Sequence, residues 1–193
     1  MKKILNLLAV MVALSALSGV AKADPLIFIT TLAGTNEVPP NASPGIGSAV
    51  VTIDGNFMTV RATFSGLLGN TTAAHIHCCV PPGENAGVAT TTPTFPGFPA
   101  GVTAGSYLQT FDLTLASTYR AGFITANGGT VAGAQAAFLA GLQGGLTYFN
   151  IHSNLFPNGE IRGQLQAVPE PATLVLLGAS LAGIAAVRKR RKG

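Results

Sequence analysis

The chain has 193 residues, of which 48% are hydrophobic and 9% are charged, and its formal net charge is +4. The basic residues are gathered at the two ends, so the stretch 24–167 carries three arginines, Arg61, Arg120 and Arg162, against six acidic residues, a net charge of −3. Because nucleic-acid binding needs lysines and arginines clustered on one face, this composition excludes a nucleic-acid-binding protein.

The N-terminus has the three parts of a secretory signal. Lys2 and Lys3 precede an apolar run over 4–20, which is followed by the small-residue pattern Ala21-Lys22-Ala23. This order predicts a signal peptide over 1–23, cut by signal peptidase between Ala23 and Asp24. An uncleaved membrane anchor is the alternative. Either way, we expect the body of the protein to lie outside the cytoplasm.

The body, 24–167, has the size of one domain, and glycine and proline interrupt its apolar segments throughout. In chain order we expect strands at 26–34, 47–54, 57–66, 72–80, 106–115, 146–153 and 159–166, with a hairpin turn at Gly55-Asn56. A helix is expected over 130–142, capped by Thr130 and stopped by Gly144. The proline-rich segment 81–104 is expected to be a long loop.

This order of elements favours a mainly β fold, an antiparallel β-sandwich of immunoglobulin or superoxide-dismutase type with one short inserted helix. A closed barrel is the alternative.

The three histidines of the chain fall in two of the expected strands. Side chains two apart share a face of a strand, so His75 and His77 point the same way. If the strand with His152 is a neighbour, the three imidazoles can meet and hold copper or zinc, with one position left open. The ordinary imidazole pKa predicts that such a site weakens below about pH 6.5. The alternative is that these are strand histidines that bind no ion.

Cys78 and Cys79 are adjacent, and their Cα atoms are closer than in an ordinary disulfide. The export compartment is oxidising, so we expect first a vicinal disulfide of structural role. Second, Cys79, on the histidine face of a regular strand, is an added metal ligand. Intermolecular cross-linking is third.

Glu160 and Arg162 are expected to form an ion pair on a strand surface, and Glu37 is expected to lie beside a turn. The sequence contains no nucleophile elbow, P-loop or dinucleotide fingerprint. Hydrolases and nucleotide-dependent enzymes are therefore disfavoured.

The C-terminus also has three parts. The triplet Pro169, Glu170, Pro171 precedes an uncharged run over 172–187 and five basic residues at 188–192. As a helix the run is about 24 Å long against a hydrocarbon core of about 30 Å, a marginal transmembrane helix. The basic cluster should stay in the cytoplasm, with the body outside.

The whole tail, 168–193, resembles the PEP-CTERM sorting signals of Gram-negative bacteria. That resemblance implies an exosortase as processing partner and a transient inner-membrane anchor. The protein would then pass to the cell surface or a polysaccharide-containing extracellular matrix. A plain single-pass anchor is the alternative.

The body itself resembles the CHRD domain, named after chordin. The resemblance rests on "LAGTNEVPPNASPGIGSAVVTI", "AAHIHCC" and "LTYFNIHSNLFPNGEIRGQL", within about 26–166. It implies a β-sandwich with His75, His77 and His152 at positions that recur in the family, and it supplies no activity.

We therefore expect a non-enzymatic surface or matrix module, with extracellular polysaccharide or protein as candidate ligands. The second hypothesis is a mononuclear copper or zinc enzyme related to superoxide dismutase. A third hypothesis takes the chordin name literally, as binding of a growth factor. The bacterial sorting tail disfavours that target, which leaves binding of some other extracellular protein or glycan through the proline-rich loop.

Overall fold

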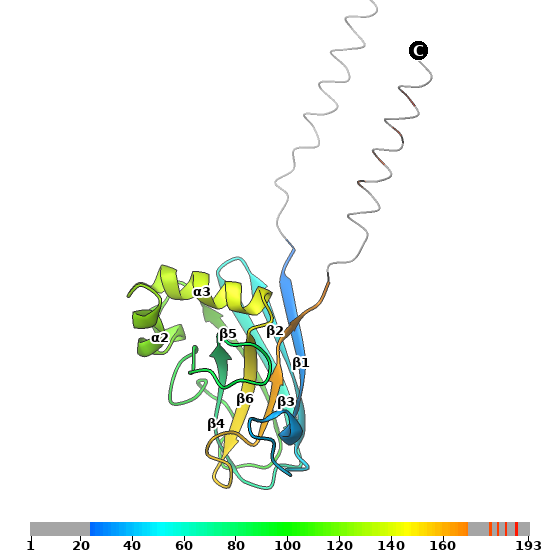
Figure 1. Ribbon diagram of the computed structural model, residues 1–193, viewed down its shortest axis with the longest axis vertical. Coiled ribbons are helices and arrows are strands. Elements are labelled where there is room, and N and C mark those ends of the chain that lie inside the picture. Colours follow the sequence, from blue (N-terminus) through cyan, green and yellow to red (C-terminus); the bar gives the residue numbers. More distant parts are fainter. Residues whose placement is uncertain (1–23, 170–177, 179–180, 182–183, 185–187, 189–193) are drawn as a thin grey trace, which may run out of the picture.

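Figure 1 shows the computed structural model, which describes residues 24–169 and the isolated positions 178, 181, 184 and 188. The predicted signal segment 1–23, with Ala23, lies outside the described residues. So do Glu170 and Pro171 of the sorting triplet and most of the predicted transmembrane helix 172–187. Among the residues that are described, no helix is long and apolar enough to cross a membrane.

Eight antiparallel strands form one hydrogen-bonded sheet, ordered β4-β6-β7-β1-β2-β3-β5, with β8 paired to β1. The strands are β1 Leu26–Ala33, β2 Ile46–Asp54, β3 Phe57–Ser65, β4 Thr71–Cys78, β5 Gly105–Asp112, β6 Thr147–Ser153, β7 Ile161–Gln164 and β8 Gln166–Ala167. Two short 3-10 turns, η1 Gly34–Asn36 and η2 Ala116–Thr118, and two helices, α2 Ala121–Ala126 and α3 Val131–Gln143, complete the described elements.

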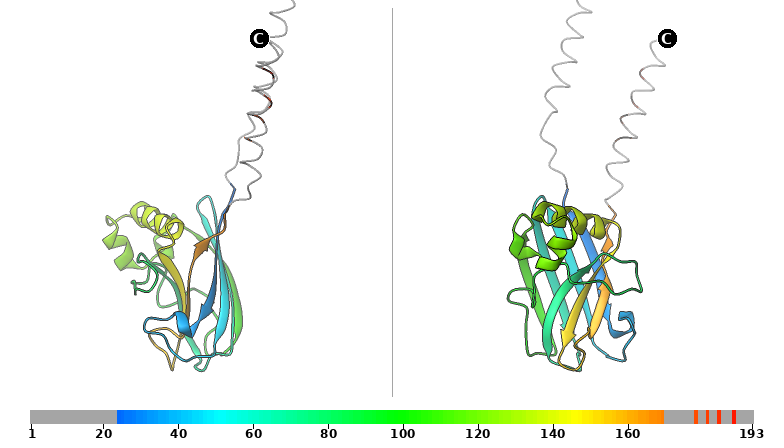
Figure 2. Two further views of the ribbon diagram at one scale, coloured as in Figure 1. Left: turned by 45° about the vertical axis from the view of Figure 1, so that its right-hand side comes forward. Right: turned by 60° about the vertical axis from the view of Figure 1, so that its left-hand side comes forward.

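The sheet curls, so that its β4-β6 end faces β2, β3 and β5 across the hydrophobic core (Figure 2). Burial alternates along the strands, as the pleat requires. In β3, for example, Met58, Val60, Ala62 and Phe64 are buried and the residues between them are not. The predicted mainly antiparallel β fold is confirmed. The two expected layers are parts of one continuous curled sheet.

The predicted helix is confirmed as α3. The Thr130 side chain accepts a hydrogen bond from the backbone N–H of Gly133 at 3.1 Å, and the N–H of Gly144 closes the last turn on the Ala140 carbonyl. The helix lies across one end of the curled sheet and buries Phe138 and Leu142 (Figures 1 and 2). The short helix α2 was not predicted, because six residues are too few for a helical period to show.

The predicted long loop, which follows β4, runs beside it and covers its free edge. The loop returns hydrogen bonds to β4: Ala89 N–H donates to the Ile76 carbonyl, and the Thr90 hydroxyl accepts from the Ile76 N–H. An exposed strand edge is a template for unwanted pairing, and the loop removes it. The loop therefore lies next to the strand that carries two of the histidines.

Candidate metal centre

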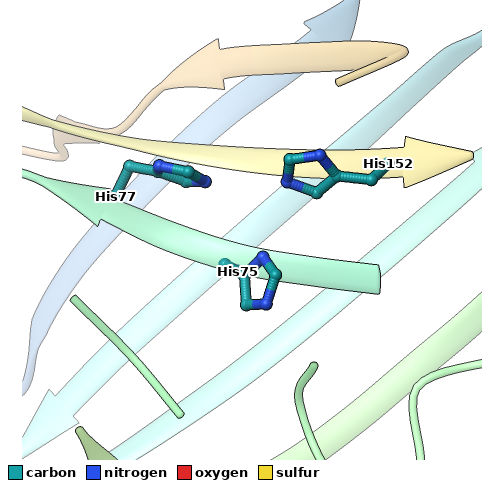
Figure 3. Close-up of side chains that lie close together, drawn as sticks. All are labelled: His75, His77 and His152. Carbon is teal, nitrogen blue, oxygen red and sulfur yellow. The ribbon is translucent and has the colours of Figure 1, made fainter. Parts of the chain in front are cut away.

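The pairing of β4 with β6 brings the three histidines together. His75 lies opposite Asn150, His77 opposite Tyr148, and His152 opposite Ala73, so all three imidazoles project from one face of the strand pair. Figure 3 shows the rings gathered around a common space. One nitrogen from each ring lies within 4.8 Å of the others. The convergence that the sequence allowed is present in the structure.

Each imidazole is held by a backbone carbonyl. His75 Nε2 lies 2.6 Å from the Pro93 carbonyl oxygen, and His77 Nδ1 lies 2.9 Å from that of Ala86. His152 Nδ1 lies 3.0 Å from the Pro157 carbonyl oxygen. A carbonyl oxygen only accepts, so these nitrogens carry the ring protons.

The remaining ring nitrogens are therefore the unprotonated ones: His75 Nδ1, His77 Nε2 and His152 Nε2. All three are buried and have no hydrogen-bond partner within the protein. An unpaired acceptor inside a protein is costly, and the pattern of one nitrogen bonded to a carbonyl and one left free is that of metal-binding histidines.

Burial keeps the imidazoles neutral. His75 and His77 are 6% and 7% exposed, and desolvation lowers the pKa of each to about 4. Their carbonyl partners act in the opposite direction. Burial also lowers the pKa of His152, which is half-buried. Neutral imidazole is the form that binds metal ions.

A stack of aromatic and cationic groups supports His77. The Tyr148 ring lies parallel to the His77 ring, with centroids 4.7 Å apart, and the Arg162 guanidinium carbon lies 4.2 Å from the centre of the Tyr148 ring. The N–H of Ala86 donates to the Tyr148 hydroxyl at 3.1 Å. Ala86, whose carbonyl orients the His77 ring, is therefore also hydrogen-bonded to Tyr148, which stacks on His77.

Arg162 anchors the loop that carries Ala86. Its guanidinium donates to the Asn36 carbonyl at 2.7 Å, to Asn85 Oδ1 at 2.8 Å and to the Glu84 carbonyl at 3.1 Å. Sequence reasoning missed this role. The partners are 77, 78 and 126 residues away in the chain, and no local pattern signals such contacts.

The predicted surface ion pair between Glu160 and Arg162 is wrong. Both side chains are buried. Glu160 accepts from the Ser43 hydroxyl and from the backbone N–H groups of Leu68 and Gly69. Glu160 precedes β7 and Arg162 lies within it, and the two side chains have separate partners from distant turns.

Glu37 lies beside a turn, as expected, as the residue that ends η1, but it is buried. Its carboxyl is 5% exposed, and burial raises its pKa to about 7, against the opposing influences of Arg162 and a hydrogen bond with Asn150. Burial comes from the docking of the following segment, in which the Asn41 amide donates to the carbonyls of Gly159 and Glu160.

The cysteines lie apart from the histidines. Cys78 and Cys79 are joined in a disulfide. Because β4 ends at Cys78, Cys79 does not continue the strand parity, and its sulfur lies 3.8 Å from the Ala137 carbonyl oxygen of α3. Gly141 of α3 leaves the space that both sulfurs occupy. The cluster of potential ligands within the described part of the chain therefore has three nitrogens and no sulfur.

At the C-terminal side, the folded body reaches the sorting triplet directly. The Val168 N–H donates to the Ile27 carbonyl at 2.8 Å, and Pro169 is the last residue of the continuous described stretch. Asp24, on the other side of the predicted signal cleavage point, lies two residues before β1. Because β1 and β8 pair antiparallel, the body begins and ends at the same end of the sheet.

Comparison with protein families gives two matches. Residues 28–165 match the CHRD domain, and residues 167–191 match the PEP-CTERM protein-sorting motif. Searches of curated proteins and of solved structures found no match. The sorting motif implies export, processing by an exosortase and sorting to the surface of a Gram-negative cell.

Proposed function

Since the chain belongs to the CHRD domain family and ends in a PEP-CTERM motif, we propose that it is an exported surface or matrix module that binds copper or zinc. His75, His77 and His152 are the ligands. The observation that carries this proposal is the set of three unpaired, buried ring nitrogens that converge while their partner nitrogens are held by carbonyls.

The dimensions of the cluster suit a small transition-metal ion. Zinc–nitrogen bonds of about 2.0–2.1 Å place tetrahedral ligand atoms about 3.4 Å apart. The three nitrogens lie within 4.8 Å of one another, so small rotations of the rings bring them to that spacing. An all-imidazole set suits zinc and copper, whereas calcium and magnesium need oxygen ligands.

The same ligands would suit a mononuclear copper or zinc enzyme related to superoxide dismutase, the alternative to a binding module. We favour binding because no carboxylate or thiol of the described residues joins the three histidines as a proton donor or acceptor. After export, the protein is expected to have extracellular polysaccharide or protein as its partner.

The metal content of the protein, purified after export by its own host, tests the proposal. We expect about one copper or zinc ion per chain, and its loss in His75→Ala, His77→Ala and His152→Ala. Arg61→Ala is the matched control, because Arg61 lies exposed on β3, away from the cluster. A wild-type protein that stays metal-free when copper and zinc are supplied, with the melting temperature unchanged, would overturn the proposal.

The cellular part has its own test. A tagged chain should lose its first 23 residues and be recovered from the cell envelope or the medium. Its recovery from the cytosol with Met1 intact would contradict export.

A further inference from the structure

The strand β5, Gly105–Asp112, forms a free edge of the sheet. It lies at one end of the strand order and pairs only with β3. Proteins usually blunt such an edge with a short strand, lysine, proline, a bulge or a covering loop. The edge of β4 has its loop, but in the described part of the chain β5 has none of these features. It is eight residues long, its register with β3 is unbroken, and its one charged residue, Asp112, stands at its end.

The backbone groups that β5 turns outward follow from the hairpin between β2 and β3. Asp54 lies opposite Phe57 across a two-residue turn, so these two residues form a hydrogen-bonded pair. Antiparallel ladders alternate hydrogen-bonded and non-hydrogen-bonded pairs, so the even-numbered residues of β3 bond to the odd-numbered residues of β5. The N–H and carbonyl groups of Ser106, Leu108 and Thr110 therefore point away from the sheet. No described residue bonds to these backbone groups.

The side chains along this edge are uncharged and open to solvent. Leu108, in the middle of the strand, is 59% exposed, and Ser106 and Thr110 on either side of it are exposed as well. These three residues share the outer face of the sheet, opposite to the buried Tyr107 and Phe111. The edge thus combines free backbone groups with an exposed apolar side chain at its centre.

A second copy of the same edge matches these groups. A two-fold axis at Leu108 places Leu108 opposite its counterpart and Ser106 opposite Thr110 of the second copy. The three resulting pairs are hydrogen-bonded pairs of an antiparallel ladder, so every free group listed above gains a partner. Arg61, opposite Leu108 on β3, lies one strand inward. Its counterpart would be three strand spacings away, about 14 Å, which exceeds the Debye length of about 10 Å at 0.1 M salt.

We propose that two copies of the chain pair edge to edge through β5, antiparallel and about a two-fold axis at Leu108. This arrangement uses the same surface of both copies, as the commonest homodimers do. Because the loop after β4 covers the other edge of the sheet, pairing stops at two copies. The interface is small and consists largely of backbone hydrogen bonds, so we expect a dissociation constant of about 1–100 μM. Pairing through β5 does not depend on a bound metal ion.

Cross-linking of the full chain, expressed in its own host, tests the register. Cys78 and Cys79 are bonded to each other, so a cysteine introduced on β5 is free to pair in the oxidising export compartment. In Leu108→Cys the two Cα atoms would be about 5.5 Å apart, a separation that a disulfide spans, and we expect a covalent dimer. In the matched edge variant Ser106→Cys they would be about 14 Å apart, so no dimer should form. Equal cross-linking of both variants, no cross-linking of either, or capture of Leu108→Cys by a different protein would overturn the proposal.

Sedimentation of the protein purified after export tests the strength of pairing. Wild type should pass from monomer to dimer between about 1 and 100 μM. Leu108→Lys places like charges directly opposite each other, so its dissociation constant should be at least about tenfold higher. Ile29→Lys should dimerise like wild type, because Ile29 is 48% exposed on the same face but lies three strands from the edge. A wild type that is monomeric at about 100 μM, or a Leu108→Lys variant that dimerises as tightly as wild type, would contradict pairing through β5.

Discussion

The metal affinity of the cluster should fall much less between pH 7 and pH 5 than that of three solvated imidazoles. Protons compete with metal for each imidazole by a factor of 1 + 10^(pKa − pH). For an imidazole with the ordinary pKa of about 6.5, this factor rises about 25-fold from pH 7 to pH 5, or about 600-fold for two. With the pKa of His75 and His77 at about 4, the two together contribute about 1.2-fold.

His152 also has a lowered pKa, so its share is below the ordinary factor of about 25. The dissociation constant should therefore rise by less than about 30-fold, whereas three solvated imidazoles would give a rise of about 10⁴. Competition with a chromophoric chelator at pH 7, 6 and 5 measures it, with Arg61→Gln as the control. A rise of several hundredfold or more would show that the ring nitrogens are hydrated in solution and that the buried, carbonyl-held arrangement is wrong.

Three further predictions follow from single contacts. Arg162→Met keeps the packing of the side-chain stem and loses three hydrogen bonds to η1 and to the loop, so the metal affinity should fall about 10- to 100-fold, while Arg61→Met leaves it unchanged. The pKa of Glu37 is about 7 in the folded protein, above its value of about 4.5 in the unfolded chain. Ionisation of this carboxyl therefore favours unfolding, and the loss of stability grows as the pH rises from about 4.5 to 7. In urea titrations of the metal-free protein, the free energy of unfolding of Glu37→Gln relative to wild type should increase by about 2–3 kcal/mol from pH 4.5 to pH 8. The same difference at the two pH values would refute this prediction. In Gly141→Ala the new methyl group would overlap the Cys78 sulfur and lie 2.8 Å from that of Cys79, so the free energy of unfolding should fall by about 1–3 kcal/mol. Gly122→Ala, whose new methyl group would make only an ordinary contact of 3.9 Å with Arg120 Nε, should show no such fall in the same urea titration.

The parts of the site that follow from strand periodicity could be predicted from the sequence. The common face of His75 and His77 needs only the two-residue period of a strand. For His152 to lie near His75 and His77, its strand must also be the neighbour of theirs. The sequence permits this, and the structure shows β4 paired with β6. The helix α3 was also predictable, because both its cap and its stop are local.

The parts that depend on long-range docking could not be predicted. Glu37 is buried because Asn41, in the segment that follows it, donates hydrogen bonds to the carbonyls of Gly159 and Glu160, which lie 118 and 119 residues further along the chain. The separate partners of Glu160 and Arg162 come from turns that have no periodicity. The departure of Cys79 from the histidine face depends on where β4 ends, and strand ends are the least regular feature of a sequence pattern.

The loop after β4 both protects the edge of that strand and orients two of the clustered histidines. An edge strand needs a partner for its free N–H and carbonyl groups, and here irregular backbone supplies it instead of another strand. Irregular backbone also leaves carbonyls that point away from the ladder, and those of Ala86 and Pro93 fix the rings of His77 and His75. In a regular strand both carbonyls would lie in the plane of the sheet, directed along the hydrogen-bond ladder and not toward the histidine face. The prolines and glycines that exclude a strand from this segment are therefore what allow it to orient the two buried histidines.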